Sequence, residues 1–300
     1  MTKEKKPKKL KYFQPIDMNM DFGGLDFSDN LGKMAGTKNK LFLRKFTSED
    51  LRRHLDDVGM IAHLEKKGFD DLLITTDLDE TAIHYMKVYD KELGPDHLLV
   101  DLRVSESKFV PDKRFFDNPD DIVTYDMIVI EWLSAQNPRI SFSNDKPQLP
   151  GQDKPGLGIL NFCFEMMYNV AKEITKDGFL DVPDHMHGSI MYSKKFSFFD
   201  PVQQAILKAI LRDLKEYSLS DISWGMITET IIEKYKKEPQ KYDPAEQIFY
   251  VSDRLKSYYK SKKYKSIYNK YFKRKRYYFD YDEMLRKRDE ILKKKSIVDL

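Results

Sequence analysis

The sequence is poor in the residues that hold small secreted proteins and metal clusters together. Its 300 residues contain one cysteine, Cys163, which excludes a disulfide framework or a cysteine metal site within one chain. No run approaches the roughly 20 apolar residues of a membrane-spanning helix. The charged opening MTKEKKPKKL is followed by no apolar stretch of the kind that a secretory signal carries. Together these absences predict a soluble, cytoplasmic protein.

The chain is rich in aromatic residues, with 18 tyrosines and 19 phenylalanines, and its charge is unevenly distributed. Residues 1–10 carry five lysines and one glutamate, and residues 251–300 carry 17 lysines and arginines against seven acids, whereas the part between them is net acidic. Basic blocks at chain ends are often arms that bind anions or fold back on an acidic body. We expect a flexible N-terminal arm (1–40), one domain (41–250) and a basic helical C-terminal segment (251–300).

Hydrophobic patterning predicts strands that alternate with helices through the middle of the chain, which indicates an α/β sheet. The expected strands are 41–46, 70–76, 97–109, 126–133, 179–182, 196–199 and 245–252. The expected helices begin at Thr47 or Ser48 and end at Gly68, and then span 159–176, 187–195, 201–217 and about 220–235, with further helices in the basic tail.

The segment PGQDKPGLG (150–158) comes directly before the helix predicted from Ile159. Gly156 and Gly158 have no Cβ, so a ligand can approach their backbone closely. The first turn of a helix adds unpaired N–H groups and a positive dipole end, which favour an anion such as a pyrophosphate. The spacing fits neither GxxxxGK[ST] nor GxGxxG, and a plain strand-to-helix turn is the alternative interpretation.

The order of elements from 126 to 199 resembles the core of the GNAT superfamily, the acetyl-CoA-dependent N-acyltransferases. Gly156-Leu157-Gly158 matches the end of that family's loop Q/R-x-x-G-x-G/A, and HGSIMYSKKFSF (187–198) loosely matches its A-x-x-x-Y-x-x-x-G-F pattern. The chain departs from the family at Asp153, which stands at the Q/R position beside Gln152, and at Pro155, which lacks an N–H. It also departs after residue 200, which looks helical where the family usually ends in a paired strand.

The resemblance implies an α/β fold with a GNAT-like mixed central sheet flanked by helices, with the C-terminal helices as an addition. It implies an acyl-CoA-dependent N-acyltransferase that uses acetyl-CoA or another acyl-CoA. The residues expected to hold the cofactor are Gln152, Gly156, Leu157, Gly158 and Ile159.

The same resemblance places Tyr192 as the general acid that protonates the leaving thiolate. Glu131 is a candidate base because its neighbours Ile130 and Trp132 are apolar, and apolar surroundings disfavour the charged carboxylate. His185, in Asp184-His185-Met186-His187, is a candidate base or substrate contact after a strand. Two histidines without a third ligand do not define a metal site, so we expect no metal. Each of these residues also has an ordinary structural interpretation.

A second resemblance lies in LLITTDLDET (72–81), where Asp77-x-Asp79-x-Thr81 is similar to the first motif of the haloacid-dehalogenase phosphatases. That family needs a later lysine and an acidic pair after further strands, and NPDDI (118–122) is a poor match to the latter. The favoured interpretation is an Asx turn.

The tail supplies an alternative function. Residues 254–279 contain 11 lysines and arginines and no acid, interleaved with seven tyrosines. This composition is typical of single-strand nucleic-acid binders, and basic amphipathic helices also lie on anionic membranes. The chain would then be a non-catalytic GNAT-like module that contacts nucleic acid or an acidic partner. A third possibility is a helix whose tyrosine face packs on the acidic body while its lysine face is solvated.

Overall fold

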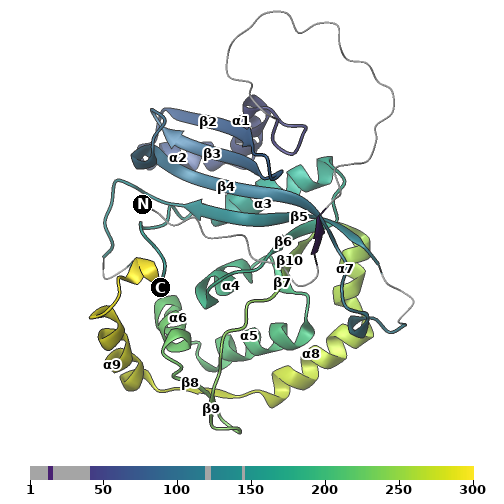
Figure 1. The fold of residues 1–300 in the computed structure, drawn as a ribbon, viewed down its shortest axis with the longest axis vertical. Helices are drawn as coiled ribbons and strands as arrows, with labels where there is room; N and C mark the ends of the chain where they lie inside the picture. The colour runs from purple at the N-terminus through teal and green to yellow at the C-terminus, as the bar shows by residue number, and fades with distance from the viewer. Residues whose placement is uncertain (1–12, 16–40, 119–122, 144–145) are drawn as a thin grey trace, which may run out of the picture.

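Residues 13–15, 41–118, 123–143 and 146–300 are described by a computed structural model of the chain (Figure 1). They form a mixed α/β fold, in which a large mixed sheet is flanked by helices and a second, three-stranded sheet lies among the C-terminal helices. The predicted α/β class with a mixed, helix-flanked sheet is therefore confirmed. The predicted arm, 1–40, lies outside the described residues except for its short strand β1 (Phe13–Pro15).

The large sheet has the strand order β2-β3-β4-β5-β6-β10-β7, and β1 pairs with the end of β4. Every neighbouring pair is antiparallel except β5 and β6, which are parallel and need a crossover between them. The strands are β2 (Leu72–Leu78), β3 (His84–Asp90), β4 (Leu98–Phe109), β5 (Tyr125–Ala135), β6 (Gly178–Asp181), β7 (Ser197–Phe198) and β10 (Gln247–Tyr250).

The crossover between the parallel strands is the helix α3 (Leu160–Glu173) with the long loop that precedes it. The parallel register pairs Met127–Val129 with Gly178–Leu180. Since β5 runs on to Ala135 while β6 ends at Asp181, the last part of β5 extends beyond its parallel neighbour. This uneven ending places the glycine loop at the end of β5.

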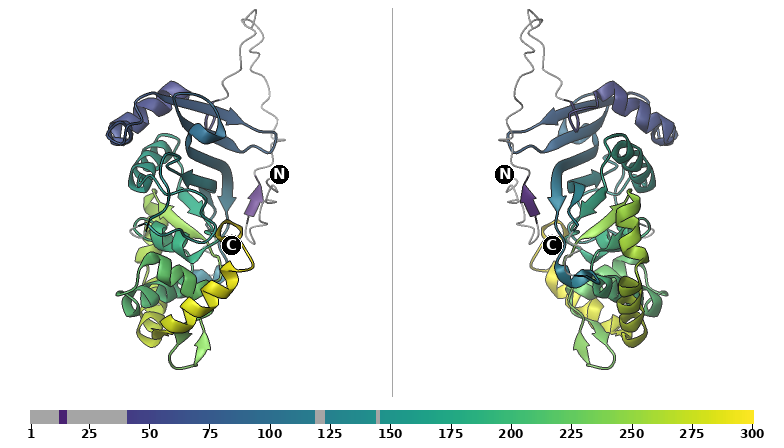
Figure 2. Two further views of the ribbon diagram at one scale, coloured as in Figure 1. Left: turned by 90° about the vertical axis from the view of Figure 1, so that its left-hand side faces the viewer. Right: turned by 90° about the vertical axis from the view of Figure 1, so that its right-hand side faces the viewer.

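The helices follow the predicted positions closely up to residue 213. Thr47 begins the first helix with a capping box, in which its side chain accepts from the Asp50 N–H and the Asp50 carboxylate accepts from the Thr47 N–H. Figure 2 shows the first three helices on one side of the strands β2–β5. The helices other than α3 are α1 (Ser48–Asp57), α2 (Met60–Glu65), α4 (Met186–Tyr192), α5 (Pro201–Asp213), α6 (Leu219–Ile227), α7 (Asp253–Lys260), α8 (Lys262–Arg274) and α9 (Tyr281–Leu292).

The second sheet consists of β8 (Ile231–Glu233), β9 (Glu238–Pro239) and β11 (Tyr277–Phe279), in the order β11-β8-β9. Short 3-10 turns occur at η1 (Pro95–His97), η2 (Lys113–Phe115) and η3 (Ile297–Asp299).

Three groups of buried apolar side chains fill the fold. The first lies between α1–α3 and one face of the large sheet and contains Phe164. The second joins β4, β5 and β10 to α7 and α8 and contains Tyr258. The third lies among α4, α5, α6 and the second sheet and contains Ile210. The basic tail therefore shares its core with the central strands.

The structure contains strands that were not predicted, the longest of which is β3 (His84–Asp90), and it differs from the predicted elements at three further places. Residues 41–46 form a turn closed by a bridge between Phe42 and Phe46, with positive φ at Leu43 and Arg44, where a strand was expected. The helix expected to end at Gly68 is interrupted by Gly59, which has a φ of 80°. The helix expected over 220–235 ends at Ile227, and the strand β8 follows it.

Candidate functional site: the glycine loop and the end of β5

The last residues of the glycine loop run beside the end of β5. The Asn137 N–H donates to the Pro155 carbonyl at 2.7 Å, and the Leu157 N–H donates to the Ala135 carbonyl at 3.3 Å. Side chains along this segment alternate, because Pro155, Leu157 and Ile159 are buried while Gly156 and Gly158 are exposed. The glycines thus present bare backbone at the surface, and Leu157 anchors the loop in the core.

The helix α3 begins at this loop without a side-chain cap. Ile159 occupies the N-cap position and makes no side-chain hydrogen bond, and the first turn contains no acidic residue. The N–H groups of a first helical turn have no intrahelical partner and carry partial positive charge. This end of α3 can therefore accept an anion.

The two glycines differ in what an added side chain would meet. Gly158 has a φ of 74°, a conformation that favours glycine, although a Cβ there would meet no atom within 4 Å. A Cβ on Gly156 would lie 3.7 Å from the Ala135 carbonyl oxygen, an ordinary contact. The fold therefore tolerates a side chain at Gly156. Such a side chain would only prevent a ligand from approaching the backbone closely.

Gln152 lies further back in the loop and closes a tight turn. Its side-chain oxygen accepts from the Leu149 N–H at 3.1 Å, and its carbonyl oxygen accepts from the Gln148 side chain at 2.6 Å. In this arrangement the Gln152 amide shapes the loop ahead of the glycines. Of the predicted donors, the Leu157 N–H is also engaged, because it already donates to Ala135.

Glu131 is the extra residue of a β-bulge in β5. In the pairing of β4 with β5, Val104 faces Ile130 and Arg103 faces Trp132, which leaves Glu131 without an opposite residue. Bulges redirect side chains and are frequent beside active sites. Here Glu131 is exposed and accepts a hydrogen bond from the Ser105 hydroxyl at 2.6 Å. The prediction that apolar neighbours surround this carboxylate is therefore wrong.

Tyr192 ends α4 and lies in the core, only 8% exposed. Its ring packs against Phe196 at 5.1 Å and meets Phe164 edge-on at 5.5 Å between ring centroids. Burial raises the pKa of Tyr192 well above its ordinary value. The phenol consequently keeps its proton at neutral pH, and the same burial makes it a weaker acid than an exposed tyrosine.

His185 and His187 stack on each other, with ring centroids 5.3 Å apart. The His187 Nδ1 lies 3.1 Å from the Ser223 hydroxyl, and burial lowers the pKa of His187 to about 4. His185 lies against Gly151, whose added Cβ would be 3.1 Å from the His185 Nε2. No group of three metal-ligating side chains was found among the described residues.

The structure brings some of the predicted residues together and separates others. Leu157, Ile159 and Tyr192 belong to one core cluster under the sheet. Within the described ranges, no hydrogen bond joins Glu131 to Tyr192, and Glu131 instead lies at the surface beside Ser105. His185 lies with His187 at the start of α4, next to Gly151 in the long loop.

A buried polar cluster beside α4 was not predicted from the sequence. The Ser189 and Tyr242 hydroxyls are 2.8 Å apart, and Tyr242 donates to the Pro183 carbonyl at 2.6 Å. Gln247 is fully buried in β10 and donates to the Ser189 carbonyl at 3.2 Å, while its side-chain oxygen has no partner among the described residues. The available signal was a glutamine at the start of the otherwise apolar strand QIFY (247–250).

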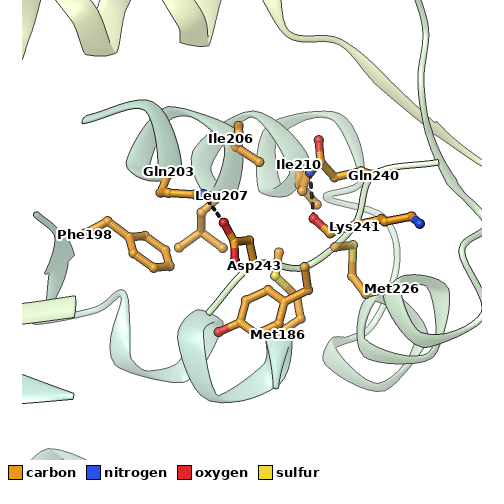
Figure 3. A pocket seen from close by; sticks show the side chains of 11 residues that line it. Met186, Phe198, Gln203, Ile206, Leu207, Ile210, Met226, Gln240, Lys241 and Asp243 are labelled. Carbon is orange, nitrogen blue, oxygen red and sulfur yellow. Dashed lines mark hydrogen bonds between the residues drawn. The ribbon is translucent and has the colours of Figure 1, made fainter. Parts of the chain in front are cut away.

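A shallow hollow lies near this cluster, between α4, α5, α6 and the segment before β10 (Figure 3). It is small and open to solvent. Met186, Leu207, Ile210 and Met226 form an apolar floor, and Asp243 approaches Gln203 at the rim. It shares no lining residue with the predicted site.

The aspartates of LLITTDLDET form a turn. The Asp79 carboxylate accepts from the N–H groups of Thr81 and Ile83, both at 2.9 Å, and from the Tyr85 hydroxyl at 2.8 Å. This turn joins the antiparallel strands β2 and β3. The Asx-turn interpretation is confirmed.

Most tyrosines of the tail are buried or half-buried, with Tyr278 as the exposed exception, so they do not form the continuous stacking surface that a single-strand binder needs. Tyr258, Tyr264 and Tyr277 are between 5% and 7% exposed. The hydroxyls of Tyr258 and Tyr264 donate to the carbonyls of Phe199 and Phe198 at 2.7 and 2.9 Å. The interpretation in which the tyrosine face packs on the body is confirmed.

Comparisons with protein-family models, with curated proteins and with solved structures found no match to this chain. Among the described residues, no helix is both long and apolar enough to cross a membrane.

Proposed function

We propose that the chain is an acyl-CoA-dependent N-acyltransferase related to the GNAT superfamily. The observation that carries the proposal is the crossover from β5 through α3 to β6. Its first strand is bulged at Glu131, its loop exposes the glycine backbone, and its helix begins without a cap. This combination would provide an anion site at the end of β5, which extends beyond its parallel neighbour β6.

A second observation favours the same family. The strand β10 pairs with both β6 and β7, so the sheet has a paired strand late in the chain, as the family usually does. The helical stretch after residue 200 is therefore an insertion before that strand, formed by α5, α6 and the hairpin of β8 and β9.

The residues of the site fit an acyl-CoA by their chemistry. The uncapped first turn of α3 and the exposed backbone of Gly156 and Gly158 would hold the pyrophosphate, and Gln152 would maintain the shape of the loop. Acetyl-CoA or another acyl-CoA supplies the thioester. The space over Gly158, where a Cβ would meet nothing within 4 Å, leaves room for such a group.

In the proposed reaction an amine nitrogen bonds to the thioester carbonyl carbon, and the carbon–sulfur bond breaks. Glu131, exposed at the bulge, takes the proton that the amine loses. Tyr192, kept protonated by its burial, gives its proton to the departing sulfur. His185, which lies beside Gly151, would contact the acceptor amine.

Acetyl-CoA should stabilise the folded protein. A ligand at one hundred times its Kd adds about 2.7 kcal/mol to the free energy of unfolding, which raises the melting temperature by a few degrees. The second readout is release of CoA in the presence of a panel of primary amines. A melting temperature unchanged by acetyl-CoA, together with no CoA release, would contradict the proposal.

A further inference from the structure

The helix α8 has two faces with different environments. One face is aromatic and packs on the body through Tyr264, Tyr268 and Phe272. The other face consists of exposed polar and basic residues. The nucleic-acid alternative would use aromatic and basic side chains together, but on α8 the fully exposed charged side chains are the basic ones, while its tyrosines are buried or half-buried.

Five exposed basic side chains, here called the basic row, follow the outer face of α8. Successive members are one to five residues apart, and together they occupy about half of the helix circumference over about 18 Å at 1.5 Å per residue. The helix contains no acidic residue, and none of the five forms an ion pair with another described residue. The basic row consists of Lys262, Lys265, Lys270, Lys273 and Arg274.

The hairpin between β8 and β9 adds further positive charge beside the basic row. Its tip, residues 234–237, reads Lys-Tyr-Lys-Lys and is exposed throughout. The Lys234 N–H donates to the Arg276 carbonyl at 2.8 Å, which fixes the hairpin beside the C-terminal end of α8. Figure 1 shows both elements at the same end of the molecule.

The basic row is held on a rigid support. Arg212 of α5 donates to the carbonyls of Phe272 and Lys275, both at 2.7 Å, and its guanidinium lies 4.5 Å from the Phe272 ring. The Tyr264 hydroxyl fixes the other end of α8 to Phe198. A partner therefore meets charges carried by one ordered helix, and little backbone conformational freedom is lost when it binds.

We propose that the basic row and the hairpin tip bind the phosphate backbone of double-stranded nucleic acid, independently of base sequence. Duplexes carry closely spaced negative charges, and lysines that neutralise them release counterions. This proposal does not rest on the acyltransferase activity, since the basic row shares no residue with the glycine loop.

Two other anionic partners fit less well. A membrane-bound amphipathic helix inserts an apolar face, but the outer face of α8 offers only polar Ser266 and Asn269 between its charges. A single strand needs exposed aromatic rings for stacking, whereas Tyr264 and Tyr268 of α8 pack on the body. Tyr235, which is 71% exposed at the hairpin tip, is the aromatic residue that would stack if a single strand were the partner.

The test measures fluorescence anisotropy of a labelled mixed-sequence DNA duplex, two to three turns long, with the full chain between about 50 and 200 mM salt. A variant with Lys262, Lys265, Lys270 and Lys273 changed to glutamine should bind the duplex at least about tenfold more weakly. Its slope of log K against log salt should be shallower by about 3 to 4, because each lost phosphate contact removes about 0.9.

The matched control changes four exposed lysines elsewhere, Lys66, Lys67, Lys91 and Lys172, to glutamine and so has the same net charge. Its slope should equal that of the unmodified protein, and both variants should keep its melting temperature. An equal loss in both variants would overturn the proposal, because overall charge would then explain binding. The proposal would also be overturned if the protein bound no duplex, or if it bound only phosphatidylserine vesicles. Binding to single strands alone would overturn it as well, and loss of that binding in Tyr235→Ala would show that stacking at the hairpin tip causes it.

Discussion

The glycine loop and the basic row both offer positive charge to an anion, but they do so by opposite means. In the glycine loop the side chains of Leu157 and Ile159 are buried and the backbone faces outward, so the charge is partial and fixed in position. In the basic row the backbone is a closed helix and full charges stand on long exposed side chains. The first arrangement suits one ligand of defined shape, and the second suits a repeating polyanion.

Two buried tyrosines, one near the glycine loop and one in the C-terminal tail, have different proposed roles. Tyr192, near the glycine loop, is proposed to react, whereas Tyr258 fastens the tail to the central sheet. Burial raises the pKa of both. The predictions below separate a phenol that acts in chemistry from one that acts only in packing.

Replacing Tyr258 by alanine should have the largest effect on stability. Its ring stacks on Phe199 with centroids 4.1 Å apart, and its hydroxyl donates to the Phe199 carbonyl. Loss of a buried aromatic ring costs about 3–5 kcal/mol of unfolding free energy, measurable by urea denaturation. Tyr235→Ala, at an exposed position, should change it by about 0.5 kcal/mol or less. Equal effects of the two variants would show that the tail is not part of the core.

Replacing Tyr192 by phenylalanine should act on turnover instead. The variant keeps the ring contacts with Phe164 and Phe196 but loses the proton donor, so CoA release should fall by roughly 100-fold. The melting temperature should change little. Glu131→Gln should lower turnover in the same assay through the loss of the base. A phenylalanine variant as active as the unmodified protein would assign Tyr192 to packing, like Tyr258.

His187, in α4, should make the stability of the folded protein depend on pH. Its pKa is lowered from 6.5 to about 4 by burial, so the unfolded chain binds a proton in this range and the folded protein does not. Stability should therefore fall as the pH decreases from 6.5 towards 4, by about 2 kcal/mol after allowance for partial exposure. Thermal melts of the unmodified protein and of His187→Gln check this, since the variant should lose that part of the pH dependence.

The parts of the fold predicted from sequence are those with long, strongly patterned segments. β4, β5 and α3 have periodic apolar residues over ten or more positions, which leaves few alternative structures. The strands β8, β9 and β11 are two or three residues long and have no period to recognise. The segment LFLRKF was predicted as a strand, yet positive φ at Leu43 and Arg44 turns it back on itself.

The candidate site was predictable in its residues more than in its geometry. The glycines and the helix start could be located because glycine and helix patterning are local properties. The bulge at Glu131 depends on pairing with β4, a contact distant in sequence, so its exposure could not be predicted. In the tail, an aromatic stripe on a basic helix has the same pattern whether it stacks on bases or packs on a core.

Calorimetric titration of acetyl-CoA into the full chain and into Gly156→Val tests the central claim most directly. The structure tolerates a side chain at this position, so the variant should remain folded while its Cβ blocks close approach to the loop backbone. We expect binding by the unmodified protein and an affinity at least about tenfold lower in the variant, a loss of about 1.4 kcal/mol. Gly94→Val, in the turn before β4, is the matched control and should bind normally. Equal affinity of the folded Gly156→Val variant, or no binding by the unmodified protein, would contradict the account.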